Sequence, residues 1–357
     1  MRNLAWIVIF GVISASSCKK KSPPVVTVGG KSLAQDGIVP LGPAFQFPTL
    51  NHELLRRGGE TNFFTPTNPN RPWTSGAFGC VRNSDTRLHE GIDIKCLKRG
   101  ADGESIDKVL SSRAGKVVHI NRNISASNYG KYVVLLHEVE GLPIYTLYAH
   151  LQSVDETMGV GGRIAAGVTL GTLGRTTNTR EGISRERAHL HFEIGVQINH
   201  KFSQWFDRWY KEGNNFHGEW NGLNLLGLDA AVILERADAG QFKMLEHLKN
   251  EESLCRVMVF HNDFDWMKRF RQLIADADVK NTETIKAWEV DLNFNGIPVR
   301  MVPVRDEIQS GGAEYRILQV DDNTLKEHPC SGLVFRKGQQ WVFTSKGQRL
   351  MNLLLYR

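Results

Sequence analysis

The sequence predicts a mostly β protein, in which an antiparallel β-sheet domain is followed by a smaller α+β domain. Apolar and polar residues alternate along four segments, as in strands that bury one face, at 116–120, 131–138, 144–151 and 189–198. Glycine-rich turns separate these segments, which favours antiparallel pairing. After about residue 230 the pattern becomes mixed. It predicts helices at 235–250 and 266–277, and strands at 299–304, 315–320 and 341–344.

The N-terminus has the pattern of an export signal. Arg2 precedes an apolar stretch at 4–13, and small residues then lead to Cys18. The stretch is too short to cross a bilayer as a helix, so we expect a secretory signal. A cysteine directly after small residues resembles a bacterial lipoprotein box, which predicts acylation of Cys18. Ala15 fits this box imperfectly, because a larger aliphatic residue is usual there, and ordinary cleavage near Ser17 is the alternative.

The chain is long enough for two domains, each with its own core. After the signal, the chain is rich in Lys, Pro, Gly and Asn with little periodicity, which indicates a tether that can wrap on the following domain. We therefore divide the chain into a signal peptide (1–17), a lipid-anchored tether (18–72), a β domain (73–229) and an α+β domain (230–357).

The charge of the chain favours an anionic partner. Lys and Arg number 44 against 38 Asp and Glu, which gives a net charge of +6. Nucleic acid and the cell envelope both fit a basic protein. The sequence has no nucleic-acid motif with interleaved aromatic residues, so we expect the envelope and no nucleic acid.

Four cysteines remain after Cys18, namely Cys80, Cys96, Cys255 and Cys330. An even number in an exported chain permits disulfides, with three possible connectivities. The simplest expectation is pairing within each domain, which would join the first two and the last two. The alternative is that all four are reduced and buried as small apolar side chains. No CxxC spacing occurs, so zinc ligation by thiolate is not expected.

Four histidines and one aspartate stand in three short motifs. These read His-Glu-Gly-Ile-Asp at 89–93, Leu-Tyr-Ala-His at 147–150 and His-Leu-His-Phe-Glu at 189–193. Imidazole nitrogens and carboxylate oxygens are the ligands of zinc in hydrolytic sites, where three protein ligands leave a fourth position for water. The set supplies three such ligands and two further histidines that can handle protons.

The spacing within the motifs agrees with a shared site. His189 and His191 lie two apart on a predicted strand, so they share one face. His89 and Asp93 are four apart, which also keeps them on one face of an extended segment, and Gly91 between them permits a bend. Each residue alone also has a structural explanation, as a core histidine, a loop residue or a cap. The ordered trio of motifs is much more specific than any one of them.

The motif order resembles the lysostaphin-type (LytM-like) zinc metallopeptidases, which cut peptide bonds in bacterial peptidoglycan. The resemblance runs from about residue 78 to 197 and implies an antiparallel sheet with a groove, of the duplicated-hybrid-motif type. It implies one Zn²⁺ per chain held by His89, Asp93 and His191. It also implies that His150 and His189 handle protons. The family does not use the glutamates at 90 and 193, so we interpret both as structural or supporting residues.

Two segments depart from the family pattern. Glu-Arg-Ala at 186–188 stands where the family often has Thr-Gly-Pro, inside a basic segment at 175–187 that we expect at the rim of the groove. The loop at 94–107 is longer and more charged than usual. Both departures affect the choice of substrate more than the chemistry.

The resemblance implies an exported zinc metalloendopeptidase that hydrolyses peptide cross-links of peptidoglycan. We expect it in the cell envelope or periplasm, anchored in the membrane through lipidated Cys18. A lipoprotein without wall-binding repeats suits the D-alanyl–diaminopimelate bond, while polyglycine bridges or a protein target stay open. The α+β domain (230–357) can bind the wall, cover the groove, or dock an amidase or another envelope partner.

Two other interpretations stay open. The first is a latent or non-catalytic zinc-binding lipoprotein that regulates a separate murein amidase. The second is a structural envelope lipoprotein whose histidines are incidental.

Overall fold

The computed structural model describes residues 44–275 and 284–357. The predicted signal peptide and Cys18 lie outside these residues. Within the described part, no helix is both long enough and apolar enough to span a membrane.

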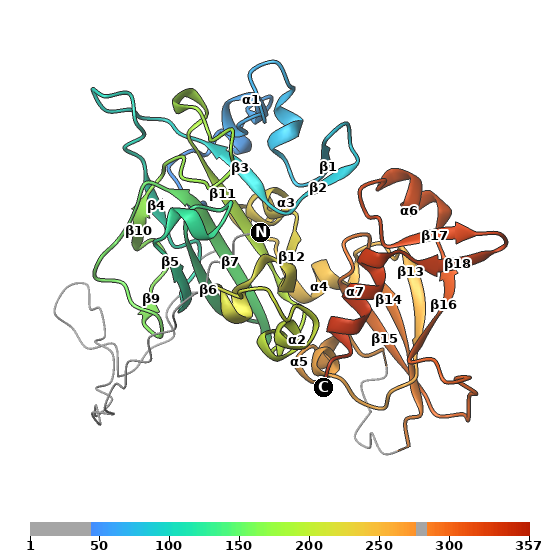
Figure 1. The fold of residues 1–357 in the computed structure, drawn as a ribbon. Coiled ribbons are helices and arrows are strands. Elements are labelled where there is room, and N and C mark those ends of the chain that lie inside the picture. Colours follow the sequence, from blue (N-terminus) through green and yellow to red (C-terminus); the bar gives the residue numbers. More distant parts are fainter. Residues whose placement is uncertain (1–43, 276–283) are drawn as a thin grey trace, which may run out of the picture.

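The β domain is built on a seven-stranded antiparallel sheet (Figure 1). The four predicted strands are confirmed as its central members, in the order β11, β7, β6 and β5. The sheet contains β12 (Leu225–Leu228), β11 (His189–Gln197), β7 (Leu142–Leu151), β6 (Lys131–Val139), β5 (Gly115–Asn121) and β9 (Arg163–Ile164), with β3 (Ile92–Lys95) also paired to β11.

Smaller elements surround this sheet. A three-stranded sheet contains β4 (Lys108–Leu110), β10 (Thr169–Thr172) and β8 (Ser153–Val154), and a hairpin contains β1 (Gly79–Arg82) and β2 (Arg87–His89). The helices of this part are α1 (Glu60–Phe63) and α2 (Phe202–Trp209). The segment from 44 to 72 packs on the domain and buries Phe45, Phe47, Phe63 and Phe64.

The alternation along β7 and β11 gives the sheet two different faces. Leu190, Phe192 and Ile194 belong to the main core of the protein. The opposite face carries a second apolar cluster that includes Leu147 and Ala149, which are paired with Glu193 and His191 of β11. The odd-numbered residues of the last histidine motif therefore lie on this second face.

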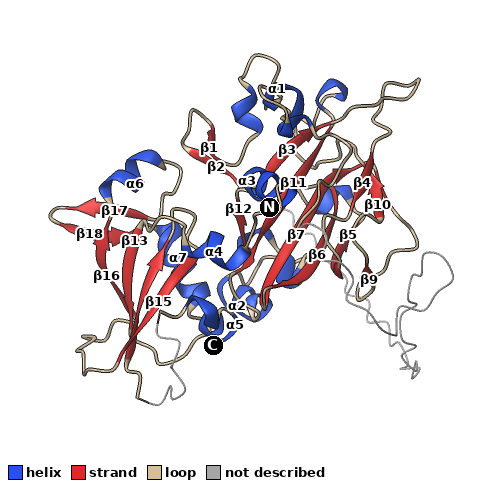
Figure 2. Ribbon diagram, turned by 180° about the vertical axis from the view of Figure 1, so that it is seen from behind, coloured by secondary structure: helices blue, strands red, loops and turns tan. Residues whose placement is uncertain are grey.

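The C-terminal part forms an α+β domain around a four-stranded antiparallel sheet (Figure 2). The three predicted strands are present, whereas β13, β14, β17 and the last two helices were not predicted. The strands are β15 (Pro298–Val304), β14 (Ala287–Leu292), β13 (Cys255–Val259) and β16 (Tyr315–Val320), followed by the hairpin of β17 (Val334–Lys337) and β18 (Gln340–Phe343). The helices are α5 (Asp265–Arg269), α6 (Asp322–Glu327) and α7 (Ser345–Leu354).

The predicted helix at 235–250 is two helices, α3 (Ala230–Asp238) and α4 (Met244–Lys249). Gly240 ends the first with a φ of 68°, in the left-handed region that favours glycine at helix ends. The predicted helix at 266–277 is shorter and ends as a 3-10 turn at Leu273, while 276–277 lie outside the described residues.

The expected pairing of cysteines within each domain is wrong, because the disulfide joins Cys80 to Cys330 across the two domains. The β1–β2 hairpin extends from the β domain toward the C-terminal domain and lies beside α6 in both views (Figures 1 and 2). Cys96 and Cys255 are free and buried. The prediction from nearness in sequence failed because the hairpin points toward the C-terminal domain and not toward Cys96.

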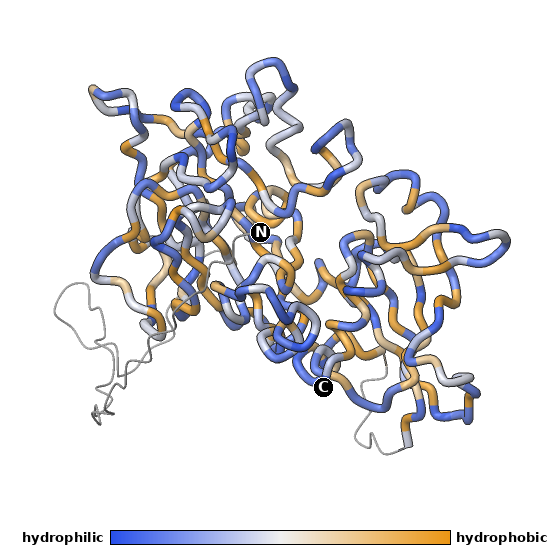
Figure 3. Tube along the Cα trace, in the orientation of Figure 1, coloured by the Kyte–Doolittle hydropathy of each residue, from blue (hydrophilic) through white to orange (hydrophobic). Residues whose placement is uncertain are grey.

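The two domains share one continuous core and several buried hydrogen bonds. Asn199 Nδ2 donates to the carbonyls of Leu353 and Tyr356, both at 2.8 Å. Asn295 Nδ2 donates to the carbonyl of Gly227 at 2.9 Å. Hydrophobic residues follow the strands of both domains, while the outer loops are largely hydrophilic (Figure 3). The C-terminal domain is thus packed against the β domain along an extensive contact.

Candidate metal centre

Three strands bring the predicted metal ligands together. Asp93 on β3 lies opposite His191 on β11 in the sheet register, and His89 ends β2. His89 Nε2 lies 3.1 Å from His191 Nδ1 and 3.2 Å from Asp93 Oδ1. His191 Nδ1 lies 3.1 Å from Asp93 Oδ1. The three side chains are buried and form a group that could hold a metal ion.

This donor set fits zinc. Zinc takes imidazole nitrogen and carboxylate oxygen at about 2.0–2.2 Å, so neighbouring ligand atoms around a tetrahedral ion are roughly 3.4 Å apart. The three observed separations of 3.1–3.2 Å need only a slight expansion to reach this value. The assignment of these residues as zinc ligands stays a prediction that the geometry supports.

Hydrogen bonds to the other ring nitrogens orient both histidines. His89 Nδ1 lies 2.7 Å from the carbonyl of Ala77, so this nitrogen carries the proton and Nε2 has a free lone pair. His191 Nε2 lies 2.9 Å from Glu193 Oε1, which leaves the lone pair of Nδ1 toward Asp93. Such outer partners fix the tautomer and the ring orientation of metal-binding histidines.

Glu193 is a supporting residue whose partners the sequence did not reveal. Its carboxylate accepts hydrogen bonds from Tyr129 Oη at 2.6 Å and Tyr145 Oη at 2.7 Å, in addition to the one from His191. The signal for its contact with His191 was present, because residues two apart on a strand share a face. The two tyrosines come from elsewhere in the sheet and its loops, so only the fold brings them to the carboxylate.

The electrostatics of the group favour a bound cation. Burial opposes ionisation of Asp93, but His189, His89 and His191 outweigh it and hold the pKa of this carboxyl well below its usual range. Burial also opposes a charge on His191, yet the protonated ring can donate hydrogen bonds to the carboxylates of Asp93 and Glu193, and this raises the pKa of His191 to about 9. Positive charge is thus stabilised at the point where the donor atoms meet.

Arg82 is a further neighbour that the sequence did not indicate. Its Nη2 atom donates to Asp93 Oδ2 at 2.6 Å, while Asp93 Oδ1 is the oxygen that faces the two histidines. The Nε atom of Arg82 is buried and has no hydrogen-bond partner among the described residues. Arg82 therefore fixes the orientation of Asp93 from the side opposite the donor group.

The two predicted proton-handling histidines lie beside this group. The ring centroids of His150 and His189 are 4.9 Å apart, and His189 Nε2 lies 3.5 Å from Asp93 Oδ1. His150 Nδ1 contacts the carbonyl of Thr176 at 2.8 Å, and His189 Nδ1 contacts that of Arg187 at 2.6 Å. Both Nδ1 atoms therefore carry the proton and both Nε2 atoms have a free lone pair.

Burial keeps this pair neutral. It is the main cause that lowers the pKa of His150 well below the usual value for histidine, and the neighbouring His189 adds to the effect. Burial likewise lowers the pKa of His189, although Asp93 opposes the shift. The backbone of His150 has a φ of 60°, which is uncommon for a residue with a side chain. Their proton-handling roles stay a prediction.

The two loops that depart from the family pattern are joined to each other. Arg175 binds Glu104 through Nε and Nη2, at 3.0 and 2.9 Å, and Arg185 Nε lies 3.1 Å from the same carboxylate. These arginines hold the pKa of Glu104 at about 2. Residues of these loops line an open pocket of about 710 Å³. Thr176, whose carbonyl contacts His150, also lines it. Glu104 thus neutralises part of the positive charge that Arg175 and Arg185 place at the rim.

Part of the chain matches a known family. Residues 87–202 match the model described as peptidase family M23. No curated protein is a significant match to the chain.

Three similar solved structures are peptidases. The catalytic domain of the antimicrobial peptidase lysostaphin from Staphylococcus simulans is 23% identical, covers 33% of this chain and 74% of that one, and has a TM-score of 0.24. A putative glycyl-glycine endopeptidase LytM from Ruminococcus gnavus is 22% identical, with 43% and 49% covered and a TM-score of 0.30. A zinc-containing peptidase from Vibrio cholerae is 24% identical, with 30% and 26% covered and a TM-score of 0.22.

The chain thus spans about half or less of two of these structures. The model match includes all three histidine motifs and the strands that carry them. The resemblance seen in the motifs is confirmed for residues 87–202, which match the model of peptidase family M23.

Proposed function

We propose that this protein is a zinc metalloendopeptidase that hydrolyses peptide cross-links of bacterial peptidoglycan. The observation that carries the proposal is the convergence of His89 Nε2, Asp93 Oδ1 and His191 Nδ1, within an M23 domain, at separations of 3.1–3.2 Å. We expect one Zn²⁺ per chain at this position. The bond cut in our proposal is the D-alanyl–diaminopimelate cross-link.

The chemistry divides between the metal and two histidines. Bound Zn²⁺ polarises a peptide carbonyl and lowers the pKa of water toward about 7. Neutral His150 and His189 each present a free Nε2, so each can accept a proton at that atom and return it to the leaving amine. The carbonyls behind their Nδ1 atoms stabilise the protonated rings. The two side chains thus share the base and acid roles.

We further propose that the protein is exported and anchored in the membrane of the cell envelope through lipidated Cys18. The apolar stretch and small residues before Cys18 support this location. The disulfide between Cys80 and Cys330 agrees with an oxidising compartment. The substrate would then lie next to the anchored enzyme.

One observation favours a second candidate, a latent or regulatory zinc-binding lipoprotein that acts on a separate murein amidase. His89, Asp93, His189 and His191 are only 2–5% exposed. Of the five predicted site residues, only His150 is half-buried rather than buried. Such limited access suits a form that needs a conformational change before it cuts.

Digestion of purified sacculi by residues 18–357, with and without a chelator, separates the two candidates. We expect chelator-sensitive loss of cross-linked dimers, with mass analysis identifying the bond. His191→Ala should lose both zinc and activity, whereas His189→Ala should retain zinc and lose turnover. His200→Ala is the control, because this histidine is exposed and outside the site. Zinc-containing protein that leaves sacculi intact would contradict the enzyme and favour the regulator.

A further inference from the structure

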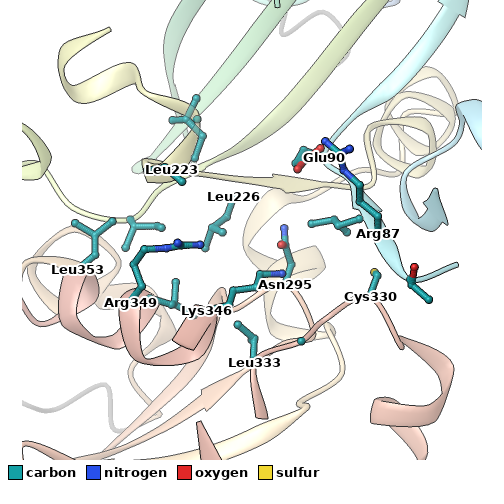
Figure 4. A pocket seen from close by; sticks show the side chains of 17 residues that line it. Arg87, Glu90, Leu223, Leu226, Asn295, Cys330, Leu333, Lys346, Arg349 and Leu353 are labelled. Atoms are coloured by element: carbon teal, nitrogen blue, oxygen red, sulfur yellow. The ribbon is translucent and has the colours of Figure 1, made fainter. Parts of the chain in front are cut away.

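A separate pocket of about 470 Å³ lies between the M23 domain and the C-terminal domain (Figure 4). This interdomain pocket is lined by Leu88, Glu90 and Leu226 on one side, and by α7 and Asn295 on the other. Its volume is within the range of small-molecule sites. It shares no residue with the predicted metal group or with the pocket beside His150.

One face of α7 gives the interdomain pocket both cationic and apolar side chains. Lys346, Arg349, Leu350 and Leu353 all line it, and their spacing of three, four and seven residues places them on one helix face. The cations come from the first half of the helix and the last leucine from its end. Figure 4 shows Arg349 between Leu353 and Lys346, with Lys346 beside Asn295. A ligand with one anionic and one aliphatic part would match this arrangement.

Positive charge exceeds negative charge in the interdomain pocket. Arg87, Lys346 and Arg349 line it together with a single carboxylate, Glu90. Within the described part of the chain, none of the four forms an ion pair within 4 Å. Lys346 Nζ donates to the carbonyl of Ser331 at 2.7 Å, and its burial lowers the pKa of this amine. Glu90 acts on Lys346 and offsets part of its charge, so the pocket keeps an excess of positive charge that an anion could meet.

The two walls of the interdomain pocket are fixed to each other. Cys330 lines the pocket and is bonded to Cys80 of the β1–β2 hairpin. Asn295, also in the lining, donates to the carbonyl of Gly227 at 2.9 Å. A ligand would bind here without closing the domains, which reduces the entropy lost on binding.

The interdomain pocket also adjoins the strand that carries a predicted metal ligand. Leu88 and Glu90 line the pocket, and His89 between them belongs to the metal group. A peptide held in the pocket would thus lie beside the segment of chain that carries His89.

We propose that the interdomain pocket binds the free-carboxylate end of a peptide with small aliphatic side chains. Lys346 and Arg349 would receive the carboxylate, and the leucines of α7 and β12 would receive the aliphatic groups. The inference rests on the proposed function, because it assigns this peptide to the peptidoglycan substrate. It gives the C-terminal domain a role in recognition and makes the two cations specificity-determining residues.

Calorimetry with the zinc-loaded full chain tests this inference. The probes are an acylated tripeptide that ends in D-Ala-D-Ala with a free carboxylate, and the same peptide as a C-terminal amide. We expect the acid to bind about tenfold more tightly than the amide, as for other charge-assisted contacts. Lys346→Met with Arg349→Met should abolish this preference while keeping the aliphatic stems. Lys337→Met removes one charge from the exposed β17–β18 hairpin and should bind as the wild type does.

Each outcome decides the inference independently of the sacculus assay. Equal binding of acid and amide, or an unchanged preference in the double variant, would overturn the pocket assignment even if sacculi are digested. Intact sacculi together with a preference that the double variant loses would refute the proposed function but retain the carboxylate site. Binding to phosphatidylglycerol vesicles that depends on both cations, without binding of the peptide, would replace the peptide by a lipid headgroup and overturn the inference.

Discussion

Replacing Glu193 with glutamine removes a buried negative charge behind His191 and preserves the size of the side chain. The carboxylate accepts from His191 Nε2 at 2.9 Å and from Tyr129 Oη at 2.6 Å through Oε1, and from Tyr145 Oη at 2.7 Å through Oε2. A glutamine carbonyl can occupy the first position, and its amide can donate to Tyr145. The number of hydrogen bonds is then preserved, and the change tests the charge.

The charge matters because it makes the imidazole of His191 a stronger donor to a metal. With Asp93, Glu193 raises the pKa of His191 to about 9 although burial opposes this. Changes to such supporting groups typically weaken metal binding by about 10- to 100-fold. This corresponds to about 1.4–2.7 kcal/mol of zinc-binding free energy. We expect Glu193→Gln to lie within this range.

Competition with a chromophoric zinc chelator at pH 7.5 would measure the effect. Tyr145→Phe is the matched control, because it removes one hydrogen bond to Glu193 but leaves its charge and its contact with His191. We expect the control to change the Kd by less than about threefold, because the charge of Glu193 and its hydrogen bond with His191 both remain. A Glu193→Gln variant with the Kd of the wild type would refute the assignment of His191 Nδ1 as a ligand supported by this carboxylate.

Three further predictions concern stability. Arg82→Met should lower the unfolding free energy of the metal-free protein by about 2 kcal/mol in urea, because Asp93 loses a charged hydrogen bond; an unchanged value would contradict that contact. Cys330→Ser should cost about 2–5 kcal/mol, since the bridge to Cys80 closes a loop of 250 residues, and a reductant should have no further effect on the variant. Burial lowers the pKa of His137 to about 4, so the unfolded chain binds the extra proton first as the pH falls. The contribution of His137 to stability should therefore fall from pH 6.5 toward 4, by about 2 kcal/mol between pH 7 and 5, and His137→Gln should remove this part of the slope.

The sequence alone determined the central strands and the candidate donor set. Alternation has a period of two, so β6, β7 and β11 could be predicted closely from their own residues. The same period put His189 and His191 on one face, where the structure has them. Local geometry of this kind needs no knowledge of distant segments.

Local sequence patterns predicted fewer of the helices and strands in the C-terminal domain. The predicted helix at 235–250 is interrupted at Gly240, where a left-handed turn lets α4 follow α3 in a new direction. The strands β13 and β14 and the helix α7 were not predicted at all. Their stability depends on the core that they share with the M23 domain, which periodicity within a single segment does not report.

Only the tertiary structure decided which distant groups meet. It placed Arg82 on Asp93, two tyrosines on Glu193, and Cys80 against Cys330, the last against the expected pairing. It also formed the interdomain pocket. These contacts depend on the direction in which hairpins and helices leave the sheets, and packing of the whole core sets that direction. The sequence therefore determined the chemical groups of the site, and the fold determined the partners that orient them and the surfaces around them.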